Sequence, residues 1–225
     1  MDTIISFCTS DIAEHAEVFL KTQRAYAERW GYNYWLFTNP IWHGEHVNSN
    51  KVPAIQMALG EMKYDETLIF FDADIGITNA TADIGDVLRV RPECYLGAYL
   101  HKHWASWFHL CDGIILMRKS PELNEYMLEW VDRCLNGDPD LIPGRRVKIV
   151  DFPHEQWHFD ACNRRRDFKG IHPATAEEVG AFSTIWSDGC AWVKGMPTVH
   201  CGGAQASWER RAQVFKEFYL PHVIE

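Results

Sequence analysis

The sequence lacks several patterns that would place it quickly in a class. It has no run of about 20 uninterrupted apolar residues, the length that a helix needs to cross a bilayer. Its first residues do not form a basic region followed by an apolar one. Its seven cysteines are scattered with no CxxC pair, a distribution unlike a disulfide framework or a zinc ribbon. We therefore expect a globular protein that stays in the reducing compartment where it is made.

Positive charge is also scarce, because 22 Lys+Arg face 31 Asp+Glu and the formal net charge is −9. Affinity for nucleic-acid backbones comes mainly from Lys and Arg, so this balance disfavours a broad nucleic-acid surface. Two groups of basic residues, within 145–148 and 164–169, keep nucleic-acid binding open as an alternative. Tryptophan and histidine are abundant, with ten and eleven residues. Tryptophan serves cores and flat ligands equally well, and most single histidines are structural.

The apolar patterns predict an α/β fold. In the first half, strands are expected at 3–8, 33–38 and 67–71, with helices reaching Trp30 and covering 52–62. The cluster Thr9-Ser10-Asp11 suggests a helix N-cap, and Gly31 a C-cap. Alternating strands and helices predict a mainly parallel sheet. Later strands are expected at 95–100, 113–117 and 147–150, with short pieces at 169–172, 182–186 and 191–193 and helices at 120–135, 155–165 and 207–219. No repeat or linker divides the chain, so we expect one domain.

Asp72 and Asp74 form a D-x-D pair directly after the apolar run at 67–71. Ligands of parallel α/β sheets bind at the carboxyl ends of strands. Two carboxylates one residue apart can share a hard divalent cation, and that cation can neutralise a diphosphate. The chain has neither a GxGxxG turn nor a P-loop, so a metal ion would have to hold the phosphates. His200, at the end of a strand-like run and next to Gly202 and Gly203, could complete the site.

A competing motif lies at 154–158, where His154, Glu155 and His158 form an HExxH pattern typical of zinc metallopeptidases. Pro153 would place the first histidine in a frayed opening turn. No third ligand follows at the expected spacing, since the chain continues Ala161-Cys162. A zinc peptidase therefore remains an alternative function.

Six segments share their order with one known family. They are RAYAERWGY (24–32), the lysine Lys51, FFDADIGITN (70–79), DGIILMR (112–118), the pair Glu155-Gln156 and VHCGG (199–203). Taken together, the chain resembles family 34 glycosyltransferases, which include fungal α-galactosyl- and α-mannosyltransferases and plant xyloglucan xylosyltransferases. Each match is short, but six in the right order over most of the chain are specific.

The resemblance implies a GT-A fold, an α/β fold with a mixed central sheet flanked by helices. It implies a single catalytic domain over 1–225, with a nucleotide-binding half at about 1–80 and an acceptor half at about 81–225. The implied reaction is metal-dependent transfer, with retention of configuration, from a nucleotide-diphosphate donor such as a UDP-sugar. The acceptor would be a glycan or another hydroxyl-bearing molecule, and the cofactor Mn²⁺ or Mg²⁺.

The resemblance also implies roles for individual residues. Asp72, Asp74 and His200 would hold the metal ion on the donor diphosphate. Asp112 would lie near a sugar, and Glu155 and Gln156 would line the reacting face and stabilise an oxocarbenium-like centre. The other residues expected to bind the donor are Thr9, Arg24, Tyr26, Lys51, Ala73, Gly202 and Gly203.

Three departures from the family pattern are visible. The family's HGY is Trp30-Gly31-Tyr32 here, its Asn before the strand glycine is Asp112, and His154 stands where an acidic residue is usual. The change at Asp112 indicates a different acceptor. Typical members carry a membrane anchor and stem for the Golgi, which this sequence does not show, so we expect a cytoplasmic enzyme. A second alternative is a non-catalytic sugar binder that stacks pyranoses on tryptophans 104, 107, 157, 186 and 192.

Overall fold

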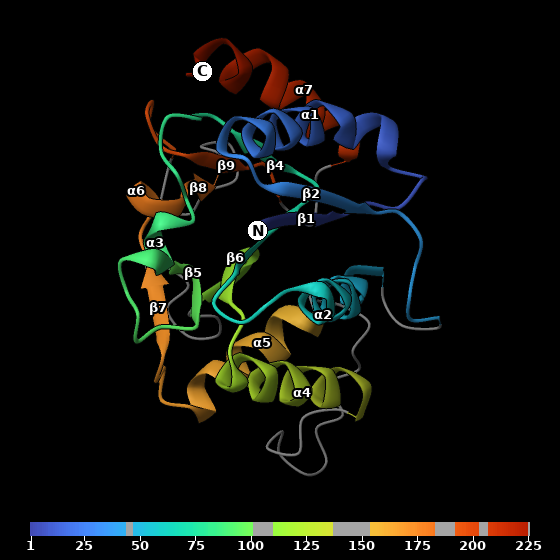
Figure 1. The fold of residues 1–225 in the computed structure, drawn as a ribbon. Helices are drawn as coiled ribbons and strands as arrows, with labels where there is room; N and C mark the ends of the chain where they lie inside the picture. Colours follow the sequence, from blue (N-terminus) through green and yellow to red (C-terminus); the bar gives the residue numbers. More distant parts are fainter. Residues whose placement is uncertain (44–46, 101–109, 137–153, 183–191, 203–206, 225) are drawn as a thin grey trace.

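The structure is a computed structural model that describes residues 1–225 except 44–46, 101–109, 137–153, 183–191, 203–206 and 225 (Figure 1). The strands are β1 (Thr3–Phe7), β2 (Asn33–Phe37), β3 (Thr67–Asp72), β4 (Ile75–Ile77), β5 (Leu96–Leu100), β6 (Leu110–Arg118), β7 (Ile171–Ala174), β8 (Ala181–Phe182) and β9 (Thr198–His200). The α-helices are α1 (Ala13–Trp30), α2 (Lys51–Glu61), α3 (Asp86–Arg89), α4 (Pro121–Asn136), α5 (His154–Arg165), α6 (Ala176–Val179) and α7 (Trp208–Val214). Shorter helical turns are η1 (Val47–Asn50), η2 (Phe215–Tyr219) and η3 (Leu220–His222).

The central sheet has six strands in the order β2-β1-β3-β6-β5-β7. Strands β1, β2 and β3 are parallel, as the sequence predicts for the first half. Strand β6 is antiparallel to both β3 and β5, and β7 is parallel to β5. The sheet is therefore mixed, as the family resemblance implies.

Both faces of this sheet are covered. Alternate residues of β3 point to opposite sides, so Ile69 and Phe71 pack in the cluster that includes Phe19 of α1, whereas Leu68 and Phe70 pack with residues of α2, α4 and α5. Figure 1 shows α1 and α7 on one side of the sheet and α2, α4 and α5 on the other. This two-sided burial explains why the run at 67–71 is continuously apolar rather than alternating.

A second, smaller sheet joins the end of the chain to the D-x-D segment. Its strand order is β4-β9-β8, and β4 pairs antiparallel with β9 so that Ile75 lies opposite His200. Gly76 of β4 leaves room for the ring of Phe215 from η2, with which a side chain at this position would collide. The small sheet therefore brings His200 beside residues that precede it by more than 120 positions.

Most predicted element ends agree with the structure. Gly31 ends α1 in the left-handed conformation at φ 71°, and the Ser120 hydroxyl accepts a hydrogen bond from the Leu123 N–H at the start of α4. The expected N-cap at 9–11 is wrong. Thr9 accepts a hydrogen bond from the Ile12 N–H through its carbonyl, in a turn before α1, and Ile12 occupies the N-cap without a side-chain bond.

Several later predictions fall outside the described residues, namely the strand expected at 147–150 and most of the short piece at 182–186, whose first residue belongs to β8. The short piece expected at 169–172 overlaps β7, and residues 192 and 193 form no strand. Among the described helices, none is both long and apolar enough to span a membrane.

Candidate active site

Six of the predicted site residues converge on one edge of the central sheet, namely Lys51, Asp72, Asp74, Asp112, Glu155 and His200. Strand β3 ends at Asp72, and β6 begins at this same edge because it runs antiparallel to β3, with Ile114 opposite Phe71. Asp112 is therefore placed beside the D-x-D segment. Helices α2 and α5 start near this edge with Lys51 and with Glu155, and β9 ends there with His200.

Asp72, Asp74 and His200 form a compact set of possible metal ligands. One ligand atom from each lies within 4.8 Å of the others. His200 Nε2 is 3.1 Å from Asp74 Oδ1 and 4.0 Å from Asp72 Oδ2. Two carboxylates and one imidazole suit a small divalent cation such as Mn²⁺ or Mg²⁺. The sequence prediction that these three side chains lie together is confirmed, whereas their binding of a metal ion stays a prediction.

Two glycines leave the space that the His200 ring occupies. A Cβ on Gly113 would lie 2.8 Å from His200 Cε1 and 3.1 Å from Asp72 Oδ2. A Cβ on Gly202 would lie 2.5 Å from His200 Nε2. A side chain at either position would displace the imidazole, so the fold is adapted to hold this ring against the two aspartates.

Lys51 joins the aspartates to a second group of carboxylates. Its buried ammonium is 2.9 Å from Asp72 Oδ1, 3.3 Å from Asp112 Oδ1 and 3.6 Å from Glu155 Oε1. Among the described residues, Asp112 Oδ2 and Glu155 Oε2 are buried without a hydrogen-bond partner. Buried polar atoms are normally satisfied, so two unpaired carboxyl oxygens side by side mark this cluster as a candidate functional site.

The pKa values of these side chains reflect their burial and the short distances between their charged groups. Burial alone would lower the pKa of Lys51, but Asp112, Asp72 and Glu155 together raise it well above its usual value. Burial raises the pKa of Asp112 to about 7, against the opposing effect of Lys51, and burial also raises the pKa of Glu155. Lys51 therefore keeps its positive charge beside two carboxyl groups, those of Asp112 and Glu155, whose pKa values burial raises.

In Asp74 and His200, by contrast, neighbouring charges shift the pKa toward the charged form despite burial. Burial alone would raise the pKa of Asp74, but His200 and Arg211 lower it below its usual range. Burial alone would lower the pKa of His200, but Asp74 raises it to about 10. Asp74 and His200 therefore favour each other's charged forms.

Gln156 is fixed to β6 through both ends of its amide. Its Oε1 accepts the backbone N–H of Asp112 at 3.0 Å, and its Nε2 donates to the Leu110 carbonyl. The Trp130 indole of α4 donates to the Glu155 carbonyl at 3.1 Å, which fixes the first turn of α5. Gln156 therefore sets the position of Asp112 as well as lying beside it.

The remaining predicted residues near the metal set occupy different places. Ala73 points away from the carboxylates and packs with Cys8, Ala16 and Leu20. Thr9 follows β1 at the same sheet edge, since Phe7 of β1 pairs with Asp72, and it is nearly buried. Gly203 lies outside the described residues.

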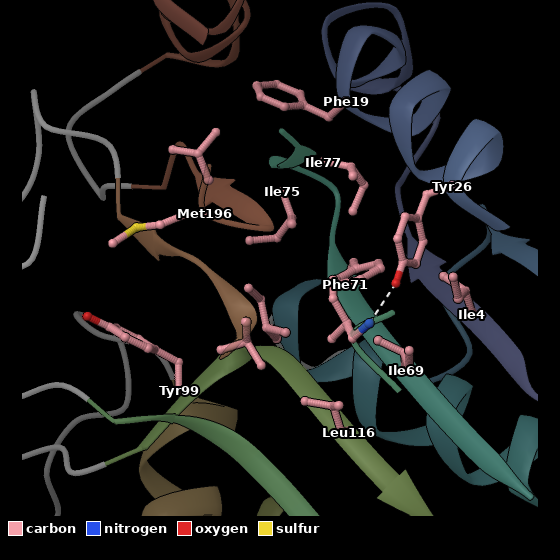
Figure 2. Close-up of a cluster of buried hydrophobic side chains, with 14 of the residues drawn as sticks. Ile4, Phe19, Tyr26, Ile69, Phe71, Ile75, Ile77, Tyr99, Leu116 and Met196 are labelled. Atoms are coloured by element: carbon pink, nitrogen blue, oxygen red, sulfur yellow. Dashed lines mark hydrogen bonds between the residues drawn. The ribbon is translucent and has the colours of Figure 1, made fainter. Parts of the chain in front are cut away.

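Arg24 and Tyr26 are not brought into this cluster. The Tyr26 ring is buried among Ile4, Ile69 and Phe71 (Figure 2), and its hydroxyl accepts the Ile84 N–H at 2.7 Å and donates to the Ala82 carbonyl. Arg24 forms an ion pair with Glu17 on the exposed side of α1. Their donor-binding roles therefore remain predictions without a contact to the metal set.

The zinc-peptidase alternative gains no support from the geometry. Glu155, which would be its general base, is paired with Lys51. Among the described side chains, the group able to hold a metal through three ligands is the one containing His200, and His158 is not part of it. The side chain of His154 lies outside the described residues.

The sugar-binder alternative loses one of its expected stacking residues. Trp192 is buried, donates to Thr78 Oγ1 at 3.0 Å and packs against Tyr219, so it offers no open face. The other four tryptophans lie outside the described side chains, namely 104, 107, 157 and 186.

Sequence reasoning missed two residues that shape the site. Gln23 of α1 is buried, and its amide donates to the backbone carbonyls of Asp72 and Ile75 at 3.1 and 2.8 Å. Arg211 of α7 donates to Asp74 Oδ2 at 2.7 Å. Gln23 lies at a core-facing position where a polar residue is unusual in an amphipathic helix, a signal that could have identified it. No local pattern indicates Arg211.

Several solved structures that are similar to this chain are glycosyltransferases. A glycosyltransferase involved in the glycosylation of the major capsid of PBCV-1 is 15% identical, with a TM-score of 0.70 over 95% of this chain and 98% of that one. The galactosyltransferase LgtC, solved with donor and acceptor sugar analogs, is 14% identical, with a TM-score of 0.53 over 100% of this chain and 97% of that one. The chain has a GT-A fold.

GlyE of Streptococcus pneumoniae TIGR4, another glycosyltransferase, is 11% identical with a TM-score of 0.50, and the match covers 79% of this chain and 46% of that one. No family model and no curated protein sequence matches the chain. The likeness is thus one of fold.

Proposed function

We propose that the chain is a metal-dependent retaining glycosyltransferase that moves a sugar from a nucleotide-diphosphate donor, a UDP-sugar in the first instance, to an acceptor hydroxyl. The observation that carries this proposal is the placement of Asp72, Asp74 and His200 at the sheet edge of a GT-A fold. LgtC supports it, since that galactosyltransferase was solved with donor and acceptor sugar analogs.

The metal set would hold Mn²⁺ or Mg²⁺ against the donor diphosphate. A bound cation there supplies Lewis-acid stabilisation of the negative charge that the departing nucleotide acquires. Asp72 Oδ2 and Asp74 Oδ1 face His200 Nε2, and Asp72 is the more exposed of the two aspartates. The diphosphate would therefore approach from the side of Asp72.

The carboxylates around Lys51 would bind the transferred sugar. Asp112 Oδ2 and Glu155 Oε2 are oxygens that can accept hydrogen bonds from sugar hydroxyls, and their burial makes such bonds specific. Lys51 holds the other oxygen of each carboxylate and balances their charge. A donor with hydroxyls in the matching positions would satisfy both orphaned oxygens at once.

Gln156 would contribute to the reacting face while fixing Asp112. The Oε1 atom that accepts the Asp112 N–H has a second lone pair, which could face positive charge developing on the sugar. One LgtC structure carries an active-site glutamine-to-glutamate change, so a glutamine belongs to the active site of that enzyme. Together with Glu155, Gln156 is thus a proposed contributor to stabilisation of the oxocarbenium-like centre.

Four broader predictions stay part of the proposal. The chain would act as a single catalytic domain with a nucleotide-binding half at about 1–80 and an acceptor half at about 81–225. Membership of family 34 is supported by the order of the six sequence segments. The acceptor would be a glycan or another hydroxyl-bearing molecule. The six described cysteines are free, which fits a cytoplasmic location.

A thermal-shift screen of nucleotide-sugars in the presence of Mn²⁺ tests the proposal. A donor that binds only the folded state at 100 times its Kd stabilises it by about 2.7 kcal/mol. For a domain of this size, that shift is about 5–11 °C in Tm. Asp74→Asn, which weakens one proposed ligand, should abolish the Mn²⁺-dependent part of the shift.

Asp86→Asn is the matched control, because Asp86 is an exposed aspartate that pairs with Arg89 of α3. It should keep the full shift. The proposal is contradicted if no nucleotide-sugar of the panel gives the wild type a Mn²⁺-dependent rise in Tm. It is also contradicted if Asp74→Asn shows the same rise in Tm as the wild type.

A further inference from the structure

Each aspartate of the metal set presents one oxygen to His200 and the other to a cationic side chain. Asp72 has Oδ2 toward His200 and Oδ1 against Lys51 at 2.9 Å. Asp74 has Oδ1 toward His200 and Oδ2 against Arg211 at 2.7 Å. The two inner oxygens and His200 Nε2 therefore surround the candidate metal position, while the two outer oxygens are already occupied.

Arg211 is held firmly in this role. It projects from α7, whose first turn is capped by the Ser207 hydroxyl accepting the Arg210 N–H. Its guanidinium lies 4.9 Å from the centre of the Trp208 ring, within the range of a cation–π interaction. The Trp208 ring in turn packs on the cluster that contains Ala73. Trp208 of α7 therefore contacts both partners' surroundings: the guanidinium of Arg211 and the cluster around Ala73, the residue before Asp74.

We propose that Arg211 is a positioning residue that restricts Asp74 to binding the metal ion through Oδ1 alone. This inference rests on the proposed function, because it assumes that the cation binds at Asp72, Asp74 and His200. Lys51 restricts Asp72 to Oδ2 in the same way. Three protein atoms then contact the cation, and the remaining positions are left for oxygens of the donor diphosphate.

One-oxygen binding determines which cations the site favours. Mg²⁺ demands a near-octahedral set of six ligands, and Mn²⁺ prefers the same arrangement, whereas Ca²⁺ takes six to eight oxygens and readily binds both oxygens of a carboxylate. With Arg211 on Oδ2, Asp74 cannot offer its second oxygen to Ca²⁺. Arg211 therefore favours Mn²⁺ over Ca²⁺, besides lowering the overall affinity for any cation through its positive charge.

The experiment measures Mn²⁺ and Ca²⁺ binding to the purified, nucleotide-free protein. Electron paramagnetic resonance of unbound Mn²⁺ gives its Kd, and competition with Ca²⁺ gives the second Kd. In Arg211→Met, the ratio of the Ca²⁺ Kd to the Mn²⁺ Kd should fall about tenfold, the lower end of the effect of one additional contact between charged groups. Arg211→Lys, which still places a cation on Oδ2, should keep the ratio close to that of the wild type.

Arg210→Met is the matched control, because Arg210 is the neighbouring arginine of α7, is exposed and contacts Gln213. It should leave both Kd values unchanged. If Arg211→Met changes both Kd values by the same factor, Arg211 acts through charge alone and the positioning role is overturned. If the wild type binds neither ion, the proposed metal site itself fails.

If Arg211→Met does not fold, Trp208→Leu takes its place. This change removes the ring under the guanidinium and keeps the charge. It should lower the Ca²⁺-to-Mn²⁺ ratio in the same direction, and an unchanged ratio contradicts the inference.

Discussion

Gly113→Ala gives a direct measure of how closely the fold is adapted to His200. The added Cβ would stand 2.8 Å from His200 Cε1 and 3.0 Å from His200 Nδ1. Ordinary contacts between carbon atoms are about 3.5–4.0 Å, so the ring and β6 must separate by roughly 1 Å. Gly113 lies within β6 between Cys111, which pairs with Tyr99 of β5, and Ile114, which pairs with Phe71 of β3. The imidazole, which is partly exposed, should move more readily than this stretch of backbone.

Two measurable consequences follow. Overpacking of a well-packed interior costs about 1–3 kcal/mol, which corresponds to a Tm lower by about 2–12 °C in a domain of this size. Displacement of a metal ligand from its orientation should raise the Kd for Mn²⁺ by at least about tenfold. Differential scanning calorimetry gives the first quantity, and titration followed by electron paramagnetic resonance gives the second.

Gly60→Ala is the control for the glycine change itself. Gly60 lies in α2 with open space around its Cβ position. Alanine there should stabilise the helix by up to about 1 kcal/mol and leave Mn²⁺ binding unchanged. A folded Gly113→Ala protein that binds Mn²⁺ within twofold of the wild type would refute the reasoning, because it would show that the position of His200 does not determine the site.

Two further predictions concern Asp112 and Gln23. Burial raises the pKa of Asp112 to about 7; between about pH 4 and that value the unfolded chain loses the proton that the folded protein keeps, so this group's contribution to stability is lost as pH rises. Asp112→Asn removes this loss. Without divalent cations, the Tm of the variant minus that of the wild type should therefore increase from pH 5 to pH 8. A Tm difference that does not change with pH contradicts the assignment. Gln23→Leu leaves the Asp72 and Ile75 carbonyls without their buried donor and should cost about 1–3 kcal/mol for each. Denaturant unfolding measures this cost. The control is Gln213→Leu on the exposed surface of α7, which should change the free energy of unfolding by less than about 0.5 kcal/mol. Equal effects of the two changes would contradict the role given to Gln23.

Local patterns predicted the elements that depend on local forces. The strands around Ile5 and Phe70 are buried on both faces, so their apolar runs identify them. Gly31 adopts the left-handed conformation that its position after a helix suggests. The D-x-D pair could be assigned to a ligand-binding edge because a buried strand precedes it and carboxyl ends of parallel strands share that edge.

The features that were missed depend on contacts between distant parts of the chain. The small sheet rests on β4, β8 and β9, each of only two or three residues, which are too short to give a periodic signal. Arg211 reaches Asp74 across 137 positions and looks like any helix-surface arginine in the sequence. The N-cap prediction failed for a local reason, because Thr9 uses its backbone carbonyl, rather than its hydroxyl, in the turn before α1.

The central claim is tested most directly by donor turnover. The protein is incubated with each nucleotide-sugar of a panel and Mn²⁺, with water taking the sugar in place of an acceptor hydroxyl, and release of the nucleoside diphosphate is followed with time. We expect at least one donor to be turned over, the reaction to stop when EDTA removes the cation, and turnover to return when Mn²⁺ is restored. Turnover that persists in EDTA, or a panel in which no donor is cleaved, would contradict a metal-dependent glycosyltransferase built on Asp72, Asp74 and His200.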